Sequence, residues 1–568
     1  MPPEREIATT APGTARRITG AGFTLRERRR SPFPGARRPA RPPRMPPVLR
    51  HVAGLRQWIF LHKARAMGKI HDMATHSSGA QPSPASKEDG PSHATATAAL
   101  LACAAALGGF LFGYDTSVIN GTVDALKSQF HLNSVVVGLV VSAALLGCAV
   151  GAWFAGPLAD RLGRIRVMQI AALLFFVSAV GSALAFNAVD LTFWRVVGGL
   201  AIGAASVIAP AYIAEVAPAS MRGRLGSLQQ LAIVLGIFAA LVADYIIAEV
   251  SDGGAAGDFP WGGSAWRWMF ASAAVPALLY GAIATTIPES PRYLVKKHEL
   301  GRARQVLGRL MPPPEVDAKV GEIVKSVKSD RRVRLSDLKG DRFGLKPIVW
   351  TGILLSVFQQ FVGINVIFYY SSTLWQSVGF SEGDAMLTSV ITSITNIVTT
   401  LIAIALVDKV GRRPLLLAGA AGMTVTLAVM TVCFATAPLV DGKPALGDVA
   451  GPTALIAANL YVLAFGATWG PVVWVLLGEM FNNWIRTSAL AVAAAAQWIA
   501  NWIITTSFPG MASVSLGLAY GTYAVFAALA FVFVFKAVPE TKGRELEDMD
   551  SLHAPGHGRS RTGEEPVR

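Results

Sequence analysis

The stretch GPLADRLGR at residues 156–164 follows one long apolar segment, and ALVDKVGRR at residues 405–413 follows another. In both stretches an aspartate precedes a glycine and an arginine at the same spacing, as Asp160 precedes Gly163. A repeat of this kind at two distant places indicates that the chain contains one structural unit twice. These two stretches therefore divide the sequence into two related halves.

Two further features recur in the same order in both halves. One is an acidic residue seven positions before an arginine, and the other is a Pro-Glu-Ser or Pro-Glu-Thr triplet. They are Glu215 with Arg222, Glu479 with Arg486, and the triplets at 288–290 and 539–541. Internal repeats of this size are typical of secondary transporters, which bind substrate near the bilayer midplane between the repeats.

Long apolar segments make up most of both halves. Hydrophobic residues form 52% of the 568-residue chain and charged residues 15%, whereas soluble domains average about 25% charged residues. The segments are 96–122, 135–158, 165–185, 190–212, 226–247, 267–287, 347–378, 385–407, 414–435, 452–480, 485–508 and 517–538. Runs of about 20 apolar residues favour membrane-spanning helices over barrel strands. The sequence therefore predicts an all-α membrane protein with twelve transmembrane helices in two six-helix halves.

Polar stretches define the other parts of the chain. The beginning is rich in Arg and Pro, a composition that cannot form a packed core. The interpretations are a disordered leader, a mis-called start codon with true initiation near Met73, and a tail that binds nucleic acid or acidic lipid. The predicted parts are a disordered basic and polar extension (1–95), the first half (96–287), an intracellular helical domain (288–346), the second half (347–538) and a cytoplasmic tail (539–568).

Lysine and arginine are concentrated in alternate loops. Arg161, Arg164 and Arg166 follow the second apolar segment, and Lys409 and Arg412 follow the eighth. Because basic loops stay on the cytoplasmic side, we expect these loops and both termini in the cytoplasm. The sequence predicts a multi-pass protein of the bacterial inner membrane that contacts the lipid bilayer and functions as a monomer.

Acidic residues accompany the arginines at the predicted cytoplasmic ends. Positive-inside anchoring explains the arginines but does not explain acidic partners at repeated spacings. We expect ion pairs that tie the helix ends together and close the inner gate when the substrate site faces outward. The residues of this predicted gate are Asp160, Arg164, Glu215, Arg222, Asp408, Arg412, Arg413, Glu479 and Arg486.

Asp115 lies in GGFLFGYDTSVING, residues 108–121, within the first apolar segment. Arg195 begins the fourth segment from the outside, so the two side chains are expected at a similar depth. Ionisable residues within a membrane are functional candidates by default. A proton that binds Asp115 from outside would release Arg195 and permit a conformational change. The alternative is a static buried ion pair.

Amide and aromatic side chains are dense in several apolar segments. Amides offer donors and acceptors to vicinal hydroxyl groups, and aromatic faces suit the apolar face of a sugar ring. The alternative is that membrane amides hold helices together. No cationic cluster accompanies them, which argues against anionic substrates, and the three cysteines form no metal-binding pattern. The candidates are Gln229, Gln230, Gln359, Gln360, Asn365, Asn396, Trp474, Gln497, Trp498 and Asn501.

Motifs spread over residues 96–550 resemble those of the sugar porters of the major facilitator superfamily. Beside the two opening stretches they are RVVGGLAIGAASVIAPAYIAE (195–215), PESPRYL (288–294), QQFVGINVIFYYS (359–371), WGPVVWVLLGEMF (469–481) and PETKGRELE (539–547). The chain is similar in particular to bacterial D-xylose–proton symporters and their glucose and galactose relatives.

The resemblance implies roles for individual residues. Asp115 is implied to be the proton-coupling carboxylate, with Arg195 as its partner. Tyr369 and Tyr370 are implied to help form the outer gate, and Phe112 to line the substrate site. The residues implied to contact the sugar are Gln230, Gln359, Gln360, Asn365, Asn396, Trp474, Gln497 and Trp498.

The chain departs from the family pattern at two positions. Ile165 follows Arg164 where many members carry a second arginine, so one inner-gate pairing is in doubt. Ile237 stands where the xylose symporter pattern has a glutamine, so glucose is at least as well supported as xylose.

The resulting prediction is import of a monosaccharide, such as glucose, galactose or xylose, by proton symport with alternating access. Facilitated diffusion of a sugar or polyol is the alternative, and a non-transporting sugar sensor is less favoured because only a short tail follows the last segment. An enzyme is not expected, because the sequence shows no nucleophile–base pattern and no Walker motif. The proton is the coupling ion, and we expect no cofactor, metal or nucleic-acid partner.

Overall fold

The computed structural model describes residues 90–217, 222–329, 335–340, 344–440, 443–444, 446–481 and 485–542. Within these residues twelve helical stretches are long and apolar enough to cross a membrane. This confirms the predicted all-α fold with twelve spans. The predicted extension up to residue 89 and the predicted tail from residue 543 lie outside the described residues.

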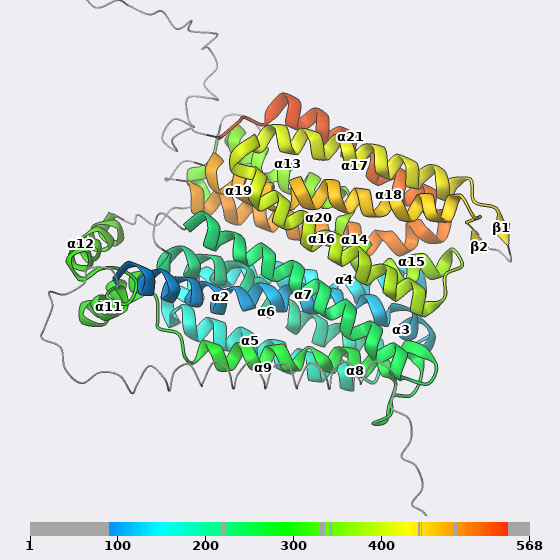
Figure 1. Cartoon of the computed structure of the whole chain (residues 1–568), viewed down its shortest axis with the longest axis horizontal. Coiled ribbons are helices and arrows are strands. Elements are labelled where there is room, and N and C mark those ends of the chain that lie inside the picture. Colours follow the sequence, from blue (N-terminus) through cyan, green and yellow to red (C-terminus); the bar gives the residue numbers. More distant parts are fainter. Residues whose placement is uncertain are drawn as a thin grey trace, which may run out of the picture. The chain divides into compact units, whose positions relative to one another are not determined.

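The first half is coloured blue to green in Figure 1 and begins with the helix that carries Asp115. Asn133, Asn187 and Ser264 precede three of its helices, and the first two accept a backbone hydrogen bond as N-caps. Its elements are α2 (Gly90–Ser117), η1 (Asn120–Thr122), α3 (Val123–Gln129), α4 (Ser134–Leu162), α5 (Arg164–Leu184), α6 (Ala188–Val216), α7 (Arg222–Val250), η2 (Gly254–Ala256), α8 (Ala265–Ser272) and α9 (Ala274–Ala284).

Short amphipathic helices connect the halves. Leu307, Val316 and Val320 form a small core of their own, and Arg304 pairs with Asp317 at 2.7 Å. The described elements here are α10 (Pro291–Lys296), α11 (Leu300–Leu307), α12 (Pro313–Ser329) and η3 (Leu335–Leu338).

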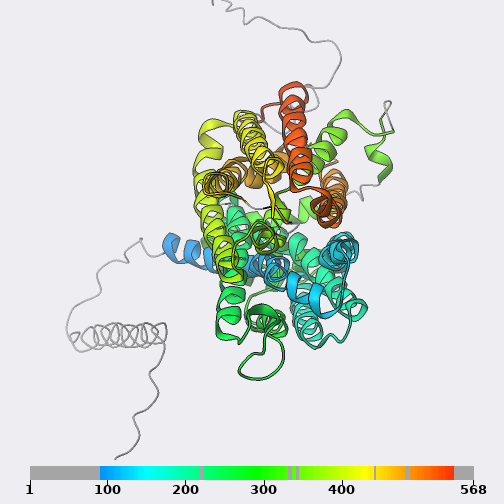
Figure 2. The same cartoon turned by 90° about the vertical axis from the view of Figure 1, so that its right-hand side faces the viewer.

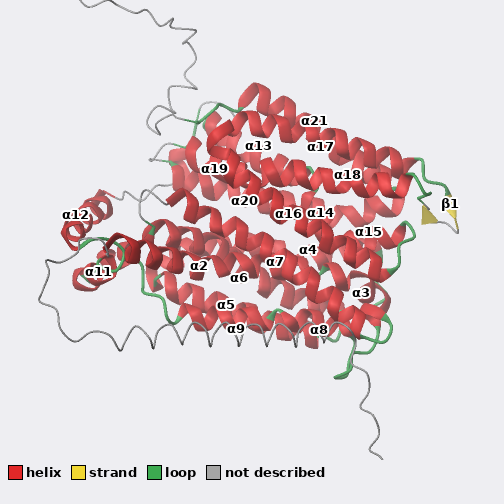
Figure 3. Cartoon of the chain, in the orientation of Figure 1, coloured by secondary structure: helices red, strands yellow, loops and turns green. Residues whose placement is uncertain are grey.

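The second half is coloured yellow-green to red in Figure 1, and Figure 2 shows it beside the first half from another direction. Helices dominate it as well, with one short hairpin in which Leu439 pairs with Pro444 (Figure 3). Its elements are α13 (Pro347–Phe361), α14 (Ile364–Tyr369), α15 (Ser371–Ser377), α16 (Glu382–Val410), α17 (Arg412–Ala435), β1 (Leu439–Val440), β2 (Lys443–Pro444), α18 (Ala450–Ala464), η4 (Phe465–Trp469), α19 (Gly470–Met480), α20 (Arg486–Val514) and α21 (Leu516–Ala537).

Four of the predicted continuous segments are broken in the structure. In the first half, the segment at 96–122 divides between α2 and η1, and the segment at 267–287 divides into α8 and α9 at Ala273. The other two lie in the second half. The segment at 347–378 divides into α13, α14 and α15, with Gly363 at φ +85° between the first two. A Cβ atom at Gly363 would meet the Tyr523 ring at 2.5 Å, so only glycine fits there. The segment at 452–480 contains the π-turn η4, which ends at Trp469, two residues before Pro471, a residue that cannot donate a backbone hydrogen bond. Turns of this kind are frequent at functional sites.

The helix bundle has two ends, which are called here the basic end and the opposite end. The basic end is where α4 passes to α5 and α16 passes to α17, beside Arg164 and Arg412. The opposite end is where α3 and α15 lie (Figure 1). The linker helices α11 and α12 lie at the basic end in Figure 1.

Helices α4 and α6 pack closely enough that their backbones touch at glycines. A Cβ atom at Gly199 would collide with the carbonyl oxygen of Ala144, and one at Gly203 with that of Cys148. Small residues allow such approach in membrane proteins, where packing rather than water exclusion joins helices. Because α6 carries Arg195, this contact helps fix the position of that residue.

Gly199→Val is expected to destabilise the folded protein by about 1–3 kcal/mol, because the added side chain forces α4 and α6 apart. The thermal midpoint in detergent, followed as loss of monodisperse protein, measures this. Gly156→Val in α4 is the matched control, because nothing lies within 4 Å of a Cβ atom there. Equal midpoints for the two variants would contradict the close-packing argument.

Candidate functional site

Asp115 and Arg195 form a buried ion pair inside the first half. Nη1 of Arg195 donates to Oδ2 of Asp115 at 3.0 Å and to the Asp115 carbonyl oxygen at 3.1 Å. The side chains are 5% and 2% exposed. Gly198 stands beside the pair, and a Cβ atom there would lie 3.5 Å from Oδ1 of Asp115. Removing one partner of such a pair leaves an uncompensated buried charge, at a cost of about 3–5 kcal/mol.

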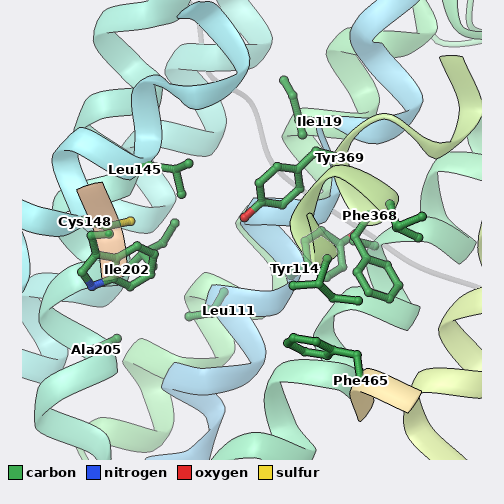
Figure 4. Packing of buried hydrophobic residues seen from close by; sticks show 14 of the residues in the cluster. Leu111, Tyr114, Ile119, Leu145, Cys148, Ile202, Ala205, Phe368, Tyr369 and Phe465 are labelled. Carbon is green, nitrogen blue, oxygen red and sulfur yellow. The ribbon is translucent and has the colours of Figure 1, made fainter. Parts of the chain in front are cut away.

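The pair is shielded from water within the packed core of the first half. Figure 4 shows Leu145, Cys148 and Ile202 gathered on one side of Leu111. Nε of Arg195 has no hydrogen-bond partner among the described residues, and its guanidinium lies 5.8 Å from the centre of the Phe270 ring. The pair therefore sits in a low-dielectric environment, where the charge of each member depends strongly on the other.

Tyr369 links α14 of the second half to the helix that carries Asp115. It is 5% exposed, and its hydroxyl group contacts the side chains of Asn501 and Thr116. Its ring points away from its own helix in Figure 4. Thr116 directly follows Asp115 in the chain, so Tyr369 connects the ion pair to the second half.

Several of the predicted sugar-contacting amides form one hydrogen-bonded chain. Asn365 Nδ2 donates to Gln360 Oε1 at 2.6 Å, and Gln360 Nε2 donates to Gln359 Oε1 at 3.4 Å. Gln359 Nε2 in turn donates to the carbonyl oxygens of Trp469 and Gly470, at 3.0 and 3.2 Å. These carbonyl groups lie at the end of the π-turn η4. The broken helices of both segments thus meet at these amides.

Aromatic rings from the two halves also meet. Phe112 of α2 lies 5.6 Å from Trp498 of α20, measured between ring centres. Gln497, next to Trp498, has a buried amide oxygen without a hydrogen-bond partner among the described residues, and Gln229 of α7 has another. Unpartnered buried acceptors are costly in a protein and suit the hydroxyl groups of a ligand.

The remaining predicted contact residues differ in burial. Asn396 of α16 is 7% exposed and Trp474 of α19 is 43% exposed. Gln230 of α7 is half-buried, whereas its neighbour Gln229 is 9% exposed. Gln229 packs against the backbone of α2, since a Cβ atom at Gly109 would lie 2.8 Å from its Nε2 atom.

The two halves are joined at the opposite end by hydrogen bonds that sequence reasoning missed. Asn120 Nδ2 donates to the Phe368 carbonyl oxygen at 2.9 Å, and Ser372 Oγ donates to the Asn120 carbonyl oxygen at 2.6 Å. Thr373 Oγ1 and Gln376 Nε2 both donate to Asp124 Oδ2. We call these six residues the outer latch. Their signal in the sequence was weak, because short polar side chains near helix ends are common.

Of the two predicted outer-gate tyrosines, Tyr370 is 1% exposed. Its hydroxyl group donates to the Thr505 carbonyl oxygen at 3.0 Å within the second half. Tyr369, described above, is the one that reaches the first half.

At the basic end, Arg164 forms a two-pronged ion pair with Glu215. Arg164 Nε donates to Glu215 Oε2 at 3.0 Å and Nη2 donates to Oε1 at 2.9 Å. Asp160 lies 3.4 Å from Arg164 and 2.9 Å from Lys296. All these residues belong to the first half or to α10.

The second half repeats this arrangement. Arg412 Nε donates to Glu479 Oε2 at 3.0 Å and Nη2 donates to Oε1 at 2.7 Å. Thr541 Oγ1 adds a hydrogen bond of 2.6 Å to Glu479. The Nη2 atom of Arg413 donates a hydrogen bond to the Phe535 carbonyl oxygen. The side chains of Arg222, Asp408 and Arg486 lie outside the described residues.

A second carboxylate in each half binds the start of the helix that carries the paired arginine. Glu289 accepts from the backbone N–H groups of Arg164 and Ile165, at 3.0 and 3.2 Å. Glu540 accepts from those of Arg412 and Arg413, at 3.0 and 2.9 Å. Acidic groups at a helix N-terminus are favourable. These are the glutamates of the repeated triplets, to which the sequence analysis gave no role.

Glu540 has a shifted pKa for identifiable reasons. Burial alone would raise the pKa of Glu540. Hydrogen bonds from the backbone N–H groups of Lys542, Arg412, Arg413 and Thr541 outweigh burial and lower that pKa below its usual value. A lowered pKa means that the folded protein holds the ionised carboxylate more strongly than the unfolded chain does.

Glu540→Gln is expected to lower the thermal midpoint at pH 7, because the neutral amide binds the helix start less well. The carboxylate stabilises the fold above the unfolded-state pKa of about 4.3, and this stabilisation is lost as the pH falls through the lower folded-state pKa. The difference in thermal midpoint between the parent protein and Glu540→Gln should therefore become smaller as the pH falls from 7. Glu299→Gln, at an exposed glutamate paired with Arg302, is the control, and a difference that does not vary with pH would contradict the assignment.

Known proteins share this architecture. Residues 101–553 match the family described as "Sugar (and other) transporter". A glucose transport protein of Synechocystis sp. is 56% identical over 463 residues, which cover 81% of this chain and 99% of that protein. The D-xylose-proton symporter of Escherichia coli is 39% identical over 489 residues, covering 79% and 94%.

Solved structures of the xylose transporter XylE from E. coli have the same fold. Its inward open conformation has a TM-score of 0.68 at 36% identity and covers 80% of this chain and 99% of that one. Its complex with 6-bromo-6-deoxy-D-glucose has a TM-score of 0.67 at 37% identity, covering 81% and 99%. In this complex XylE is described as a proton:xylose symporter of the major facilitator superfamily. The chain described here therefore belongs to the sugar transporter family of the major facilitator superfamily and is a membrane transport protein, not an enzyme.

Proposed function

We propose that this chain imports a monosaccharide, a hexose such as glucose or galactose or the pentose xylose, together with a proton. It works as a monomer in the bacterial inner membrane, with its basic end and both termini in the cytoplasm. The basic loops support this orientation. The observation that carries the proposal is the buried pair of Asp115 and Arg195, 3.0 Å apart.

The Asp115 carboxylate binds and releases the coupling proton. While it is ionised, Arg195 holds it and the buried charges balance. A proton on the carboxylate leaves Arg195 without a counter-charge, so the pair separates and α2 and α6 are free to rearrange. Thr116 and Tyr369 connect α2 to the second half, which gives this rearrangement a path to the domain interface.

The sugar site lies between the halves, at the amide chain and the Phe112–Trp498 contact. Amides from α13 and α14 and rings from α2 and α20 supply hydrogen bonds and an apolar face for a pyranose. The relatives named above for glucose and D-xylose transport support a neutral monosaccharide.

The conformation fits the stage of the cycle after sugar release. The outer latch joins the halves at the opposite end, while the ion pairs described at the basic end stay within one half or its linker helix. The paired, ionised Asp115 corresponds to a carrier that has given up its proton to the cytoplasm. In the outward-facing stage the charged residues at the basic end are expected to pair across the halves.

Asp115→Asn is expected to abolish sugar accumulation while exchange of sugar across the membrane survives, because an amide cannot carry the proton. The measurement is uptake of labelled glucose and xylose, with and without a protonophore, in cells that lack their own carriers. Asp317→Asn, at an exposed linker carboxylate, is the control and should accumulate sugar normally. Parent protein that only equilibrates sugar and ignores the protonophore would show a facilitator, the alternative function.

Trp498→Ala is expected to raise the KM for sugar at least about tenfold, which corresponds to about 1.4 kcal/mol, because the ring that faces Phe112 is lost. Initial uptake rates at varied sugar concentration measure it. Ile499→Ala is the matched control, since Ile499 is the next residue of α20 and is 52% exposed. A KM that is the same in both variants would place the sugar elsewhere.

A further inference from the structure

A second buried carboxylate lies in the first half, away from Asp115. Asp244 of α7 is 1% exposed. Its Oδ2 atom accepts a hydrogen bond of 3.2 Å from the backbone N–H group of Gly121. Its Oδ1 atom has no hydrogen-bond partner within the described part of the chain. Neither the ion pair of Asp115 nor the networks of the basic end include Asp244.

The charged groups near Asp244 do not neutralise it. The helices and turns packed against α7 are α2, α6, α8, α16, η1 and η2. The Tyr114 hydroxyl group of α2 lies near enough to Asp244 for an electrostatic interaction. That hydroxyl group is, however, hydrogen-bonded to Ser272 at 2.7 Å. Among the other charged groups on these elements, Arg195 binds Asp115, and Arg267 binds the carbonyl oxygens of Ala183 and Ala185. Glu382 accepts from the Ala255 N–H group, Asp384 from Ser381 and Asp190 from the Phe186 N–H group. Glu215 binds Arg164 at the basic end, and Glu249 of α7 itself lies beside Gly383.

Two more facts limit what Asp244 binds. The described residues contain no group of three or more His, Cys, Asp or Glu side chains that would hold a metal ion. A lone ionised carboxylate in a membrane interior, with one backbone hydrogen bond, costs several kcal/mol. A neutral carboxylic acid at the same place still accepts from Gly121 and costs far less.

Asp244 also lies directly against the outer latch. Its partner Gly121 follows Asn120, the latch residue bonded to Phe368 and Ser372 of the second half. A Cβ atom at Gly121 would lie 2.8 Å from the Cβ atom of Asp244, so the carboxyl group packs tightly against η1. The carboxyl group is therefore in direct contact with the segment that carries the latch residue Asn120.

We infer that Asp244 is a second proton-binding site of this transporter and that a proton on it holds the outer latch closed. The carboxylate takes up one proton from the aqueous phase at the opposite end when the latch is open, and closure then buries a neutral acid. At high pH the ionised carboxylate needs water and favours the open latch. This inference deepens the proposed proton coupling, and it assigns to Asp244 a role separate from that of Asp115.

The test measures latch opening without sugar or transport. Spin labels are placed at Lys127→Cys in α3 and Thr436→Cys after α17, with the exposed native Cys103 replaced by alanine, in lipid nanodiscs. Distances are recorded from about pH 5 to about pH 9, a range wide enough for a buried carboxyl group. The parent protein should show at least about a twofold rise in the population of longer distances as the pH rises.

Asp244→Asn should keep the shorter distance at every pH, because its amide cannot ionise and still accepts from Gly121. Asp244→Ser, a smaller neutral variant, should do the same and covers the case in which the first variant does not fold. Asp384→Asn, at an exposed carboxylate of α16 that binds Ser381, and Tyr114→Phe are the controls for other ionisable groups on the elements packed against α7, and both should retain the shift with pH.

The inference is overturned if both Asp244 variants shift with pH as the parent does, or if the parent does not shift at all. It is also overturned if Asp384→Asn removes the shift, since Asp384 would then be the group that controls the latch. Because the readout involves no sugar, a failure of the proposed symport in the uptake assay leaves this result interpretable by itself.

Discussion

The burial of Asp115 beside Arg195 is the constraint on which the rest of the structure depends. Two opposite charges are tolerated in an apolar bundle only when they are close together and well oriented. That requirement places α2 against α6, and the glycines of α4 and α6 allow the helices to come near enough. In the symport that we propose, one proton on Asp115 changes the balance of this pair, so the interaction that stabilises the first half is also the one on which the proton gradient acts.

At the basic end, both halves have the same arrangement of one arginine and two glutamates. In each, an arginine at the start of a helix binds one glutamate through its side chain, while a second glutamate accepts from the backbone of that helix start. The arrangement ties helix ends together within each half. The outer latch and the Phe112–Trp498 pair, by contrast, are contacts between the halves, and in the proposed transport cycle these are the contacts that change.

Two of the breaks in the helices lie beside the predicted sugar-contacting amides. Gly363 interrupts one span and the π-turn before Pro471 interrupts another. Breaks of this kind leave backbone carbonyl groups unpaired within their own helix, and Gln359 binds two of them. The same amide chain then reaches Gln360 and Asn365. The substrate site that we propose therefore lies where helices are discontinuous, as expected for a carrier.

The sequence by itself determined the twelve spans, the duplicated halves and the depth of Asp115 and Arg195, because these follow from hydrophobic length, repeat spacing and the cost of charge in a membrane. It also picked out the acidic and basic residues of the two networks. Only the tertiary structure decided which glutamate binds which arginine, that Gln359 binds backbone, and that Asn120 and Asp124 join α15. The structure likewise showed that Asp244 lacks a counter-charge. Such facts depend on which helices become neighbours, and a local pattern carries no information on contacts between residues more than a hundred positions apart.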